Sequence, residues 1–277
     1  MSAGYRRRGR TICEDFVDQA HTAWNWIRYS ILTRIPISEE SITDFSLLNL
    51  GLKHPHEIIT RKINRRQESV EGADWEWWLT DERSWLGLLV QAKKIGSRRL
   101  EYRGIGKTDK NGRMQIDVLI QSALQSVPKR IPLYVFYNYW DQRRFDPSWL
   151  CGTYQKSVGM LGCGVSHAAA VRQVLLAGST RLHDLSKSIY PWSCLVCCTG
   201  YSDETSNLPS RAFDFLSNSF GPYDEAEYGP EMRSRFISKE VPSYVRTILG
   251  GEPLSEEERN LTKARRVTII REKSTWT

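Results

Sequence analysis

The sequence predicts an α/β fold in which helices flank a mixed sheet. Three observations predict it. Apolar residues recur at steps of three and four in the first 50 residues, three strand-like runs follow, and a further amphipathic stretch then precedes another strand-like run. The order over residues 39–140 is therefore helix, three strands, helix and strand. A chain of 277 residues that is 40% hydrophobic and 26% charged is globular, which excludes collagen-like and disordered classes.

Two helices are predicted at the N-terminal end. The first covers residues 11–33 and ends before Pro36. Its apolar face is formed by Ile12, Phe16, Ala20, Ala23, Trp24, Ile27 and Ile31. The second begins after Ser38 or Ser41 as N-cap and stops at Gly51. The acidic residues of its first turn are Glu39 and Glu40.

The pattern then becomes that of strands. Residues 57–64, 72–79 and 85–95 are rich in β-branched, aromatic and aliphatic side chains, and the polar turn 81–84 joins the last two. We expect these three runs to form an antiparallel three-strand meander. After a glycine-rich basic loop, an amphipathic helix that starts near Gln115 leads to a strand at 131–140.

The second half is predicted more coarsely. The expected elements are a helix at 165–178, a buried strand at 191–198, a surface excursion at 199–235, a helix opened by a Ser255 and Glu258 capping box, and a strand at 265–270. We divide the chain into an N-terminal helix (1–38), a core (39–140) and a C-terminal α/β elaboration (141–277) that can belong to the same domain.

The six cysteines do not indicate a disulfide scaffold. They are unevenly spaced at positions 13, 151, 163, 194, 197 and 198, which favours reduced thiols. A zinc site that includes Cys194 and Cys197 is an alternative, but the apolar context favours packed thiols. The first 16 residues lack a secretory signal pattern, and no apolar run is long enough to cross a membrane, so we expect a cytoplasmic protein.

The positive charge lies in the first half of the chain. The net charge is +7, and residues 1–130 hold 22 lysines and arginines against 16 acidic residues, whereas residues 131–277 hold 17 against 16. Such a basic half favours nucleic acid as a partner. The candidate contacts are Arg61, Lys62, Arg65, Arg66, Lys94, Arg98 and Arg99. The oligomeric state is left open, with a homodimer as one of the states allowed.

Strand alternation gathers polar side chains on one face of the predicted hairpin. Asp74 and Glu76 share a face, and Gln91 and Lys93 share a face of the next strand. A turn centred between residues 82 and 83 pairs positions whose numbers add to 165, which places Asp74 opposite Gln91 and Glu76 opposite Leu89. Trp78 is on the carboxylate face and can wall a site there, whereas Trp75 and Trp77 face the core.

These side chains suit a phosphodiesterase. Mg²⁺ or Mn²⁺ prefers oxygen ligands, which Asp74, Gln91 and Glu76 can supply. Lys93 can orient the attacking water or stabilise the charge on phosphate. Glu40, preferred here to Glu39, can assist from the preceding helix. The alternative to a catalytic site is that this face of the hairpin is exposed to solvent and has no catalytic or binding role.

Asp74 followed, after a short hairpin, by Gln91, Ala92 and Lys93 resembles the PD-(D/E)xK restriction-endonuclease-like superfamily, in its Mrr-type branch with Gln in place of the second acid. Ala73 stands where that motif has Pro. The resemblance implies a restriction-endonuclease-like core and metal-dependent cleavage of DNA rather than RNA, in defence against foreign DNA. It also implies that Gln115 can approach the site.

Four segments, GADWEWW, VQAK, PLYVFYN and IYPWSC, also resemble a microbial domain family of unknown function that would cover most of the chain. The rival hypothesis to a nuclease is a catalytically silent module on the same fold, which binds nucleic acid or protein.

Overall fold

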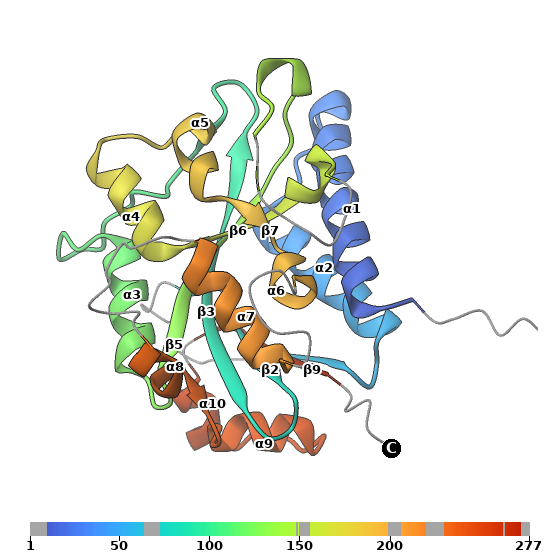
Figure 1. The fold of residues 1–277 in the computed structure, drawn as a ribbon. Helices are drawn as coiled ribbons and strands as arrows, with labels where there is room; N and C mark the ends of the chain where they lie inside the picture. The colour runs from blue at the N-terminus through green and yellow to red at the C-terminus, as the bar shows by residue number, and fades with distance from the viewer. Residues whose placement is uncertain are drawn as a thin grey trace, which may run out of the picture.

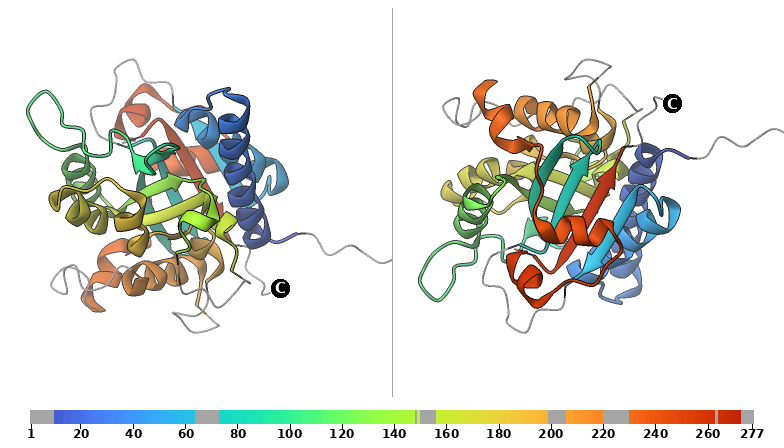
Figure 2. Two further views of the ribbon diagram at one scale, coloured as in Figure 1. Left: turned by 90° about the horizontal axis from the view of Figure 1, so that it is seen from above. Right: turned by 90° about the horizontal axis from the view of Figure 1, so that it is seen from below.

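The computed structural model describes residues 10–63, 73–147, 149, 156–198, 206–219, 230–262 and 264–272. In them a nine-stranded mixed sheet has helices on both faces (Figures 1 and 2). Its strands are β1 (Ile58–Lys62), β2 (Trp75–Thr80), β3 (Trp85–Gly96), β4 (Glu101–Tyr102), β5 (Arg130–Tyr137), β6 (Cys163–His167), β7 (Tyr190–Pro191), β8 (Ile237–Ser238) and β9 (Arg266–Arg271). The strand order is β1-β9-β2-β3-β5-β6-β7, and β4 and β8 also pair with β3.

The helices are distributed along the whole chain. They are α1 (Ile12–Thr33), α2 (Glu39–Lys53), α3 (Gln115–Gln125), α4 (Ala168–Leu176), α5 (Leu182–Leu185), α6 (Cys194–Cys197), α7 (Leu208–Ser219), α8 (Pro230–Phe236), α9 (Ser243–Leu249) and α10 (Glu256–Leu261), with short 3₁₀ helices at Gln142–Arg144, Val158–Gly162 and Ser186–Ser188. Within the described residues, no helix combines the length and apolar character that a membrane span requires.

The helix caps follow from the sequence. Ser38 is the N-cap of α2, and its side chain accepts a hydrogen bond from the backbone of Ser41. Ser255 and Glu258 form the predicted capping box of α10. Gly51, expected to end α2, lies inside it, because the helix continues to Lys53.

The predicted meander is correct for its hairpin and wrong for its first strand. β2 and β3 pair in the predicted register, from Trp75 opposite Val90 to Thr80 opposite Trp85. β1, however, pairs with β9, and β9 lies between β1 and β2, parallel to β2. The burial of the strands gives the reason: β9 is almost wholly buried and takes two neighbours, whereas the exposed second half of β1 suits a sheet edge.

The predicted helix and strand after the hairpin are confirmed. α3 crosses from β3 to β5, and the two strands pair in parallel. This pairing sets Gln91 beside Tyr134 and Lys93 beside Phe136, on the face of the sheet that α3 covers. The sheet takes strands from both 39–140 and 141–277.

The second half departs from expectation at three places. The helix expected at 165–178 begins only at Ala168, because residues 163–167 form strand β6, which pairs with β5. Instead of the strand expected at 191–198, the structure has the two-residue strand β7 (Tyr190–Pro191) followed by α6. α6 begins after its N-cap Ser193, whose carbonyl accepts a hydrogen bond from the backbone N–H of Cys197 (2.8 Å). The excursion expected at 199–235 contains α7 and α8 among its described residues. α7 is a helix because its apolar side chains, including Phe213 and Phe215, are buried against the sheet.

The cysteines also differ from expectation. Cys13 in the first turn of α1 and Cys197 of α6 form a disulfide, with 5.2 Å between their Cα atoms, so the expectation of reduced thiols is wrong for this pair. The alternative of a zinc site at Cys194 and Cys197 is excluded in this state, because the Cys197 sulfur is already bonded. Cys163, Cys194 and Cys198 are buried thiols, and Cys151 lies outside the described residues.

A buried ionic network fixes α9 to the sheet. The Glu76 carboxylate accepts hydrogen bonds from Arg130 (2.9 Å), from the Tyr244 hydroxyl (2.5 Å) and from the Trp78 indole (3.2 Å). The Arg130 guanidinium also donates to Tyr244 (3.0 Å) and lies over the Trp78 ring. Both charged side chains are almost fully buried, so each compensates the desolvation of the other.

Removing one side of this pair should therefore be costly. We predict that Glu76→Ala lowers the free energy of unfolding by about 3–5 kcal/mol, because it leaves the Arg130 charge buried without its carboxylate. Urea titration followed by circular dichroism measures this change. The matched control is Glu240→Ala on the surface, expected to stay within about 0.5 kcal/mol of wild type. Equal stability of the two variants would contradict this account of Glu76.

Candidate functional site

Asp74 and Gln91 meet where β2 begins. Asp74 directly precedes β2, and one of its carboxylate oxygens accepts hydrogen bonds from the backbone N–H of Ala92 (2.7 Å) and the side-chain amide of Gln91 (2.5 Å). Among the described residues, the other carboxylate oxygen accepts no hydrogen bond. The cross-strand contact expected from the hairpin register is therefore present, and one carboxylate oxygen is left without a hydrogen bond from the described residues.

Gln115 connects this pair to Lys93. As the first residue of α3, Gln115 donates from its amide to the side-chain oxygen of Gln91 (3.2 Å) and accepts from the ammonium group of Lys93 (3.4 Å). The structure thus brings the Asp74, Gln91 and Lys93 side chains together through an amide supplied by the crossover helix.

The length of β3 explains the position of this cluster. β3 has twelve residues and β2 has six, so residues 91–96 of β3 extend beyond the start of β2. There they pair with β5 and β4, while α2 and α3 begin beside them. Gln91 is 4% exposed and Lys93 is 7% exposed. Two polar side chains are therefore held by strand geometry in an environment that is largely closed to solvent.

This burial disfavours both charged forms. Burial raises the pKa of Asp74, and the nearby Glu39 charge raises it further, against the opposing effects of the Ala92 N–H and the Lys93 charge. Burial likewise lowers the pKa of Lys93, although the charges of Glu39 and Asp74 oppose that shift. A carboxyl and an amine that are both perturbed by burial are typical of functional sites.

The glutamate that approaches the site is Glu39, and the preference for Glu40 is wrong. The Glu39 carboxylate accepts a hydrogen bond from the backbone N–H of Lys94 (3.0 Å). Glu40 is exposed and binds Arg266 of β9 (3.0 Å). The reason is the helical turn of about 100° per residue after the Ser38 cap, which directs neighbouring side chains to different strands.

Glu76 and Trp78 do not belong to the cluster. Both lie on the face of β2 that Asp74 shares, but Glu76 is roughly 7 Å farther along the strand. There α9 covers them, and the Glu76 carboxylate is held by Arg130 and Tyr244. The predictions that Glu76 is a metal ligand and that Trp78 walls the site are therefore not supported by this geometry.

Tyr134 is a site neighbour that the sequence analysis missed. It lies beside Gln91 in β5, it is fully buried, and within the described part of the chain its hydroxyl has no hydrogen-bonding partner. Its pKa is raised by burial and by the charges of Asp74 and Asp117. No pattern within the strand marks this residue, because its placement depends on the pairing of β5 with β3.

The donor set fits a hydrated divalent ion better than a zinc site. In the described residues, no group of three or more His, Cys, Asp and Glu side chains is arranged to hold a metal. Mg²⁺, however, binds proteins through one or two carboxylates and keeps several waters. The Asp74 carboxylate supplies one such ligand, and Gln91 supplies a second when its amide turns to bring to Asp74 the oxygen that accepts from Gln115 in this structure. The buried hydroxyl of Tyr134, which has no hydrogen-bonding partner among the described residues, lies beside Gln91.

The candidate nucleic-acid contacts differ in availability. Arg61 donates to the carbonyl of Gly251 (3.5 Å), Lys62 lies 3.7 Å from Asp44, and Lys94 is half-buried with its ammonium on a backbone carbonyl. Arg98 and Arg99 are exposed in the β3–β4 turn and form no ion pair with the described residues. Arg65 and Arg66 lie outside the described residues.

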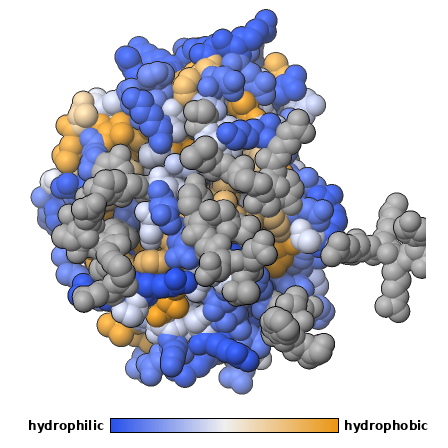
Figure 3. All heavy atoms as spheres, viewed as in Figure 1, coloured by the Kyte–Doolittle hydropathy of each residue, from blue (hydrophilic) through white to orange (hydrophobic). Residues whose placement is uncertain are grey.

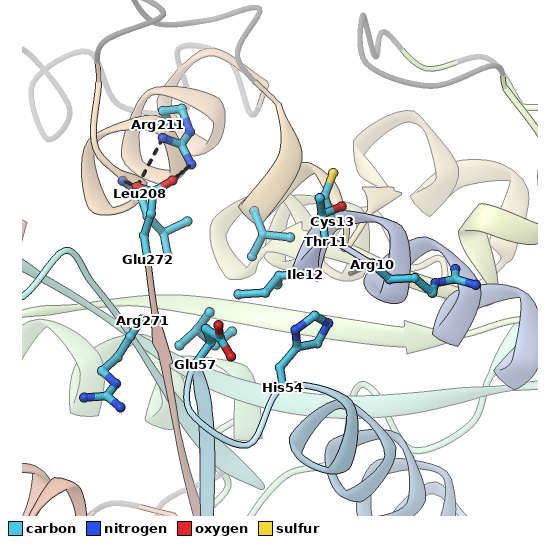
Figure 4. A pocket seen from close by; sticks show the side chains of 12 residues that line it. Arg10, Thr11, Ile12, Cys13, His54, Glu57, Leu208, Arg211, Arg271 and Glu272 are labelled. Atoms are coloured by element: carbon cyan, nitrogen blue, oxygen red, sulfur yellow. Dashed lines mark hydrogen bonds and ion pairs between the residues drawn. The ribbon is translucent and has the colours of Figure 1, made fainter. Parts of the chain in front are cut away.

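A separate cavity of about 290 Å³ lies at the first turn of α1 (Figure 4). Thr11, Cys13 and His54 line it, together with the ion pair between Arg211 and Glu272 (2.7 Å). None of Asp74, Gln91 and Lys93 lines this cavity. The candidate site is thus distinct from it.

The buried Asp74 carboxyl should make stability depend on pH. Because its folded-state pKa is raised, ionisation of Asp74 opposes folding above that pKa and has no effect below its ordinary value of 3.8. We predict that Asp74→Asn, which keeps an acceptor for Ala92, is more stable than wild type at neutral pH and that the gain vanishes as pH falls below 3.8.

Thermal unfolding followed over a pH series measures this difference. The matched control is Asp141→Asn, because hydrogen bonds to Arg143 lower the pKa of that exposed carboxyl. The ionised form of Asp141 therefore favours folding, and its replacement gains no stability at neutral pH. A gain for Asp74→Asn that persists at the acid end of the series would refute this assignment.

A comparison with protein-family models gives a match over most of the chain. A family model described as "Family of unknown function (DUF6615)" matches residues 12–275. No curated protein matches the chain. The family match runs from α1 past β9 and includes all the residues of the candidate site, in agreement with the resemblance of most of the sequence to a family of unknown function. The chain therefore belongs to the family of unknown function DUF6615.

Proposed function

We propose that this chain is a metal-dependent phosphodiesterase that cleaves DNA at the Asp74, Gln91 and Lys93 site. The observation that carries the proposal is the contact between Asp74 and Gln91, with Lys93 joined to the same amide network through Gln115. A carboxylate and an amide oxygen are ligands that a divalent ion accepts, and a nearby amine can offset charge on phosphate, so these groups support metal-assisted phosphodiester hydrolysis.

The proposal includes a restriction-endonuclease-like core made of α2, β1 to β3, α3 and β5. The support is the β2–β3 hairpin, the parallel crossover through α3, and Glu39 at the start of α2. The departure is β9, which lies between β1 and β2. Because β9 inserts beyond the hairpin edge, it leaves the pairing of β2, β3 and β5 intact.

Each residue has a defined task. Asp74 and Gln91 would hold the ion, and Gln115, which donates to the Gln91 side-chain oxygen, would position the amide. Bound Mg²⁺ or Mn²⁺ would polarise the phosphate and lower the pKa of a bound water. Lys93 donates to the attacking water or to a phosphate oxygen, so it fixes the nucleophile and offsets the negative charge that grows in the transition state. Water adds to phosphorus as one ester P–O bond breaks, which gives a phosphomonoester and an alcohol.

The second candidate is a catalytically silent binding module on the same fold. The observation that favours it is the weak ligand at position 91, because a neutral amide binds a divalent ion less strongly than a carboxylate does. In the described residues, Asp74 is the one carboxylate in direct contact with Gln91. A role in defence against foreign DNA stays a prediction under either candidate.

The nuclease proposal predicts loss of cleavage in site variants. Asp74→Ala and Lys93→Ala should each reduce the rate by about a hundredfold or more, as expected when a group that stabilises transition-state charge is removed. Supercoiled plasmid, linear DNA and RNA are incubated with Mg²⁺, Mn²⁺ or a chelator, and the products are separated on gels.

The controls are Asp141→Ala and Lys187→Ala, two exposed residues of the same types, which should cleave like wild type. Full activity of either site variant would reject the site. If the folded wild-type protein binds DNA but cleaves neither DNA nor RNA with any of these ions, the chain is a catalytically silent binding module.

Binding should depend on salt through the arginines of the β3–β4 turn. We predict that affinity for DNA falls as salt rises, because phosphate contacts release counterions. Arg98→Glu combined with Arg99→Glu should weaken binding to unrelated sequences alike, since such contacts read backbone charge. Fluorescence anisotropy over a salt series measures both effects.

The control is a charge reversal of equal size near α9, Lys239→Glu with Arg246→Glu, both exposed. It should change binding less than the turn variant does. If the affinity for DNA does not change with salt, or if both double variants lose the same affinity, the β3–β4 turn is an ordinary solvated surface and not a DNA contact.

A further inference from the structure

Exposed apolar side chains gather at one place in the described molecule. Seven of the ten large hydrophobic residues that are exposed lie between residues 29 and 52, at the end of α1 and along α2. They are Tyr29, Ile31, Leu32, Ile35, Phe45, Leu48 and Leu52. Figure 2 shows α1 and α2 (blue) at the side of the molecule, next to the edge strand β1. Scattered exposed apolar residues are ordinary, but a cluster of this kind marks an interaction surface.

The cluster contains a regular stripe on α2. Phe45, Leu48 and Leu52 are 52%, 55% and 70% exposed, and their spacing of three and then four residues aligns them along one helical face. The opposite face of α2, with Ile42, Leu47 and Leu50, is already buried in the protein core. α2 is therefore apolar on both sides, whereas a helix at a free surface carries polar residues on its outer side.

α1 widens this stripe. The Trp26 ring packs edge-to-face against Phe45, with 5.9 Å between the ring centroids. Tyr29 is one helical turn beyond Trp26 on the same side of α1 and is 58% exposed. We name the set of Phe45, Leu48, Leu52 and Tyr29 the α2 stripe.

We propose that the α2 stripe is the interface of a homodimer, in which α2 packs antiparallel to α2 of a second copy across a two-fold axis. The axis passes beside Leu48, near the middle of the stripe. Residues whose numbers add to about 97 then face one another, so Phe45 lies opposite the partner subunit's Leu52. Spacing of three and four residues is the pattern that packs two helices along a seam.

The charges of α2 favour the same arrangement. Asp44 precedes the stripe and pairs with Arg266 and Lys62 of its own chain, and Lys53 follows the stripe and pairs with Asp15. Both side chains stay partly exposed, at 41% and 45%. The same relation places Asp44 opposite the partner subunit's Lys53, so each of these ion pairs gains a further opposite charge from the partner. A helix surface that is acidic at one end, apolar in the middle and basic at the other complements itself when it is turned through the two-fold axis.

The exposed area of the α2 stripe is large enough to form the centre of a dimer interface. The four residues of the α2 stripe expose on the order of 500 Å² of side chain, more than half of the roughly 800 Å² that each partner buries in a standard interface. Flanking polar side chains of α1 and α2 supply the remaining contact, as the polar rim of an interface does. This inference does not depend on the proposed enzymatic activity.

The test measures mass against concentration by sedimentation velocity. We expect the wild-type protein to be a dimer at micromolar concentration. Leu48→Glu should weaken the dimer about a hundredfold or more, because it sets two carboxylates against each other on the axis. Leu52→Glu repeats the test at the most exposed position of the stripe, where no effect on folding is expected.

The matched control is Leu176→Glu. Leu176 of α4 is also exposed, at 61%, and Figure 3 shows an apolar area over α4 on a face that is otherwise mainly hydrophilic. This variant should remain dimeric. Circular dichroism confirms that each variant is folded. A wild-type monomer at all concentrations, or a dimer that both stripe variants leave intact, overturns the proposal, and so does equal dissociation in the control.

A cross-linking experiment tests the geometry. Leu48→Cys should form a disulfide between two copies under mild oxidation, because the two positions face each other across the axis. Leu52→Cys alone should not, since its two copies lie roughly 10 Å apart along antiparallel helices. Non-reducing gels distinguish the outcomes, with wild type as the control for the native cysteines. Cross-linking at position 52 but not at 48 would overturn the antiparallel arrangement.

Discussion

The β2–β3 hairpin and its unequal strands are the constraint on which the candidate site depends. β2 begins directly after Asp74, whereas the antiparallel β3 continues past this point to Gly96 and pairs in parallel with β5. That difference in length leaves the Asp74 carboxylate beside the backbone of Ala92 and opens one face of β3 to the first residue of α3. A shift of one residue in this register would turn Gln91 and Lys93 to the opposite face and dissolve the cluster.

Two groups of buried charges serve opposite purposes in this fold. Glu76 and Arg130 compensate each other, so their network holds α9 on the sheet. Asp74 and Lys93 are not compensated in this way, since burial raises the pKa of the carboxyl and lowers that of the amine. Carboxyl and amine groups whose pKa values are shifted by burial cluster at functional sites, and this supports the proposal that places the chemistry at Asp74.

Residue patterns that are local in the sequence were enough to predict the β2–β3 hairpin and the contact that it creates. The turn at 81–84 sets the pairing sum of the hairpin, and thereby the contact of Asp74 with Gln91, because strand alternation is strictly periodic. Features that depend on distant parts of the chain were not predictable. β9 enters between β1 and β2 from the far end of the sequence, and Tyr244 closes over Glu76 from 168 residues away. Glu39 and Glu40 fit the first turn of a helix equally well, and only the position of β3 separates them.

Binding of Mn²⁺ to the folded protein tests the central claim most directly, because it does not require the substrate to be known. We expect the wild-type chain to bind Mn²⁺ in a calorimetric titration and Mg²⁺ to compete. Asp74→Asn should remove the binding, whereas Glu76→Gln should leave it in place. If Mn²⁺ does not bind, or binds equally well to the Asp74→Asn protein, the cluster at the start of β2 is not a metal site and the proposed mechanism is wrong.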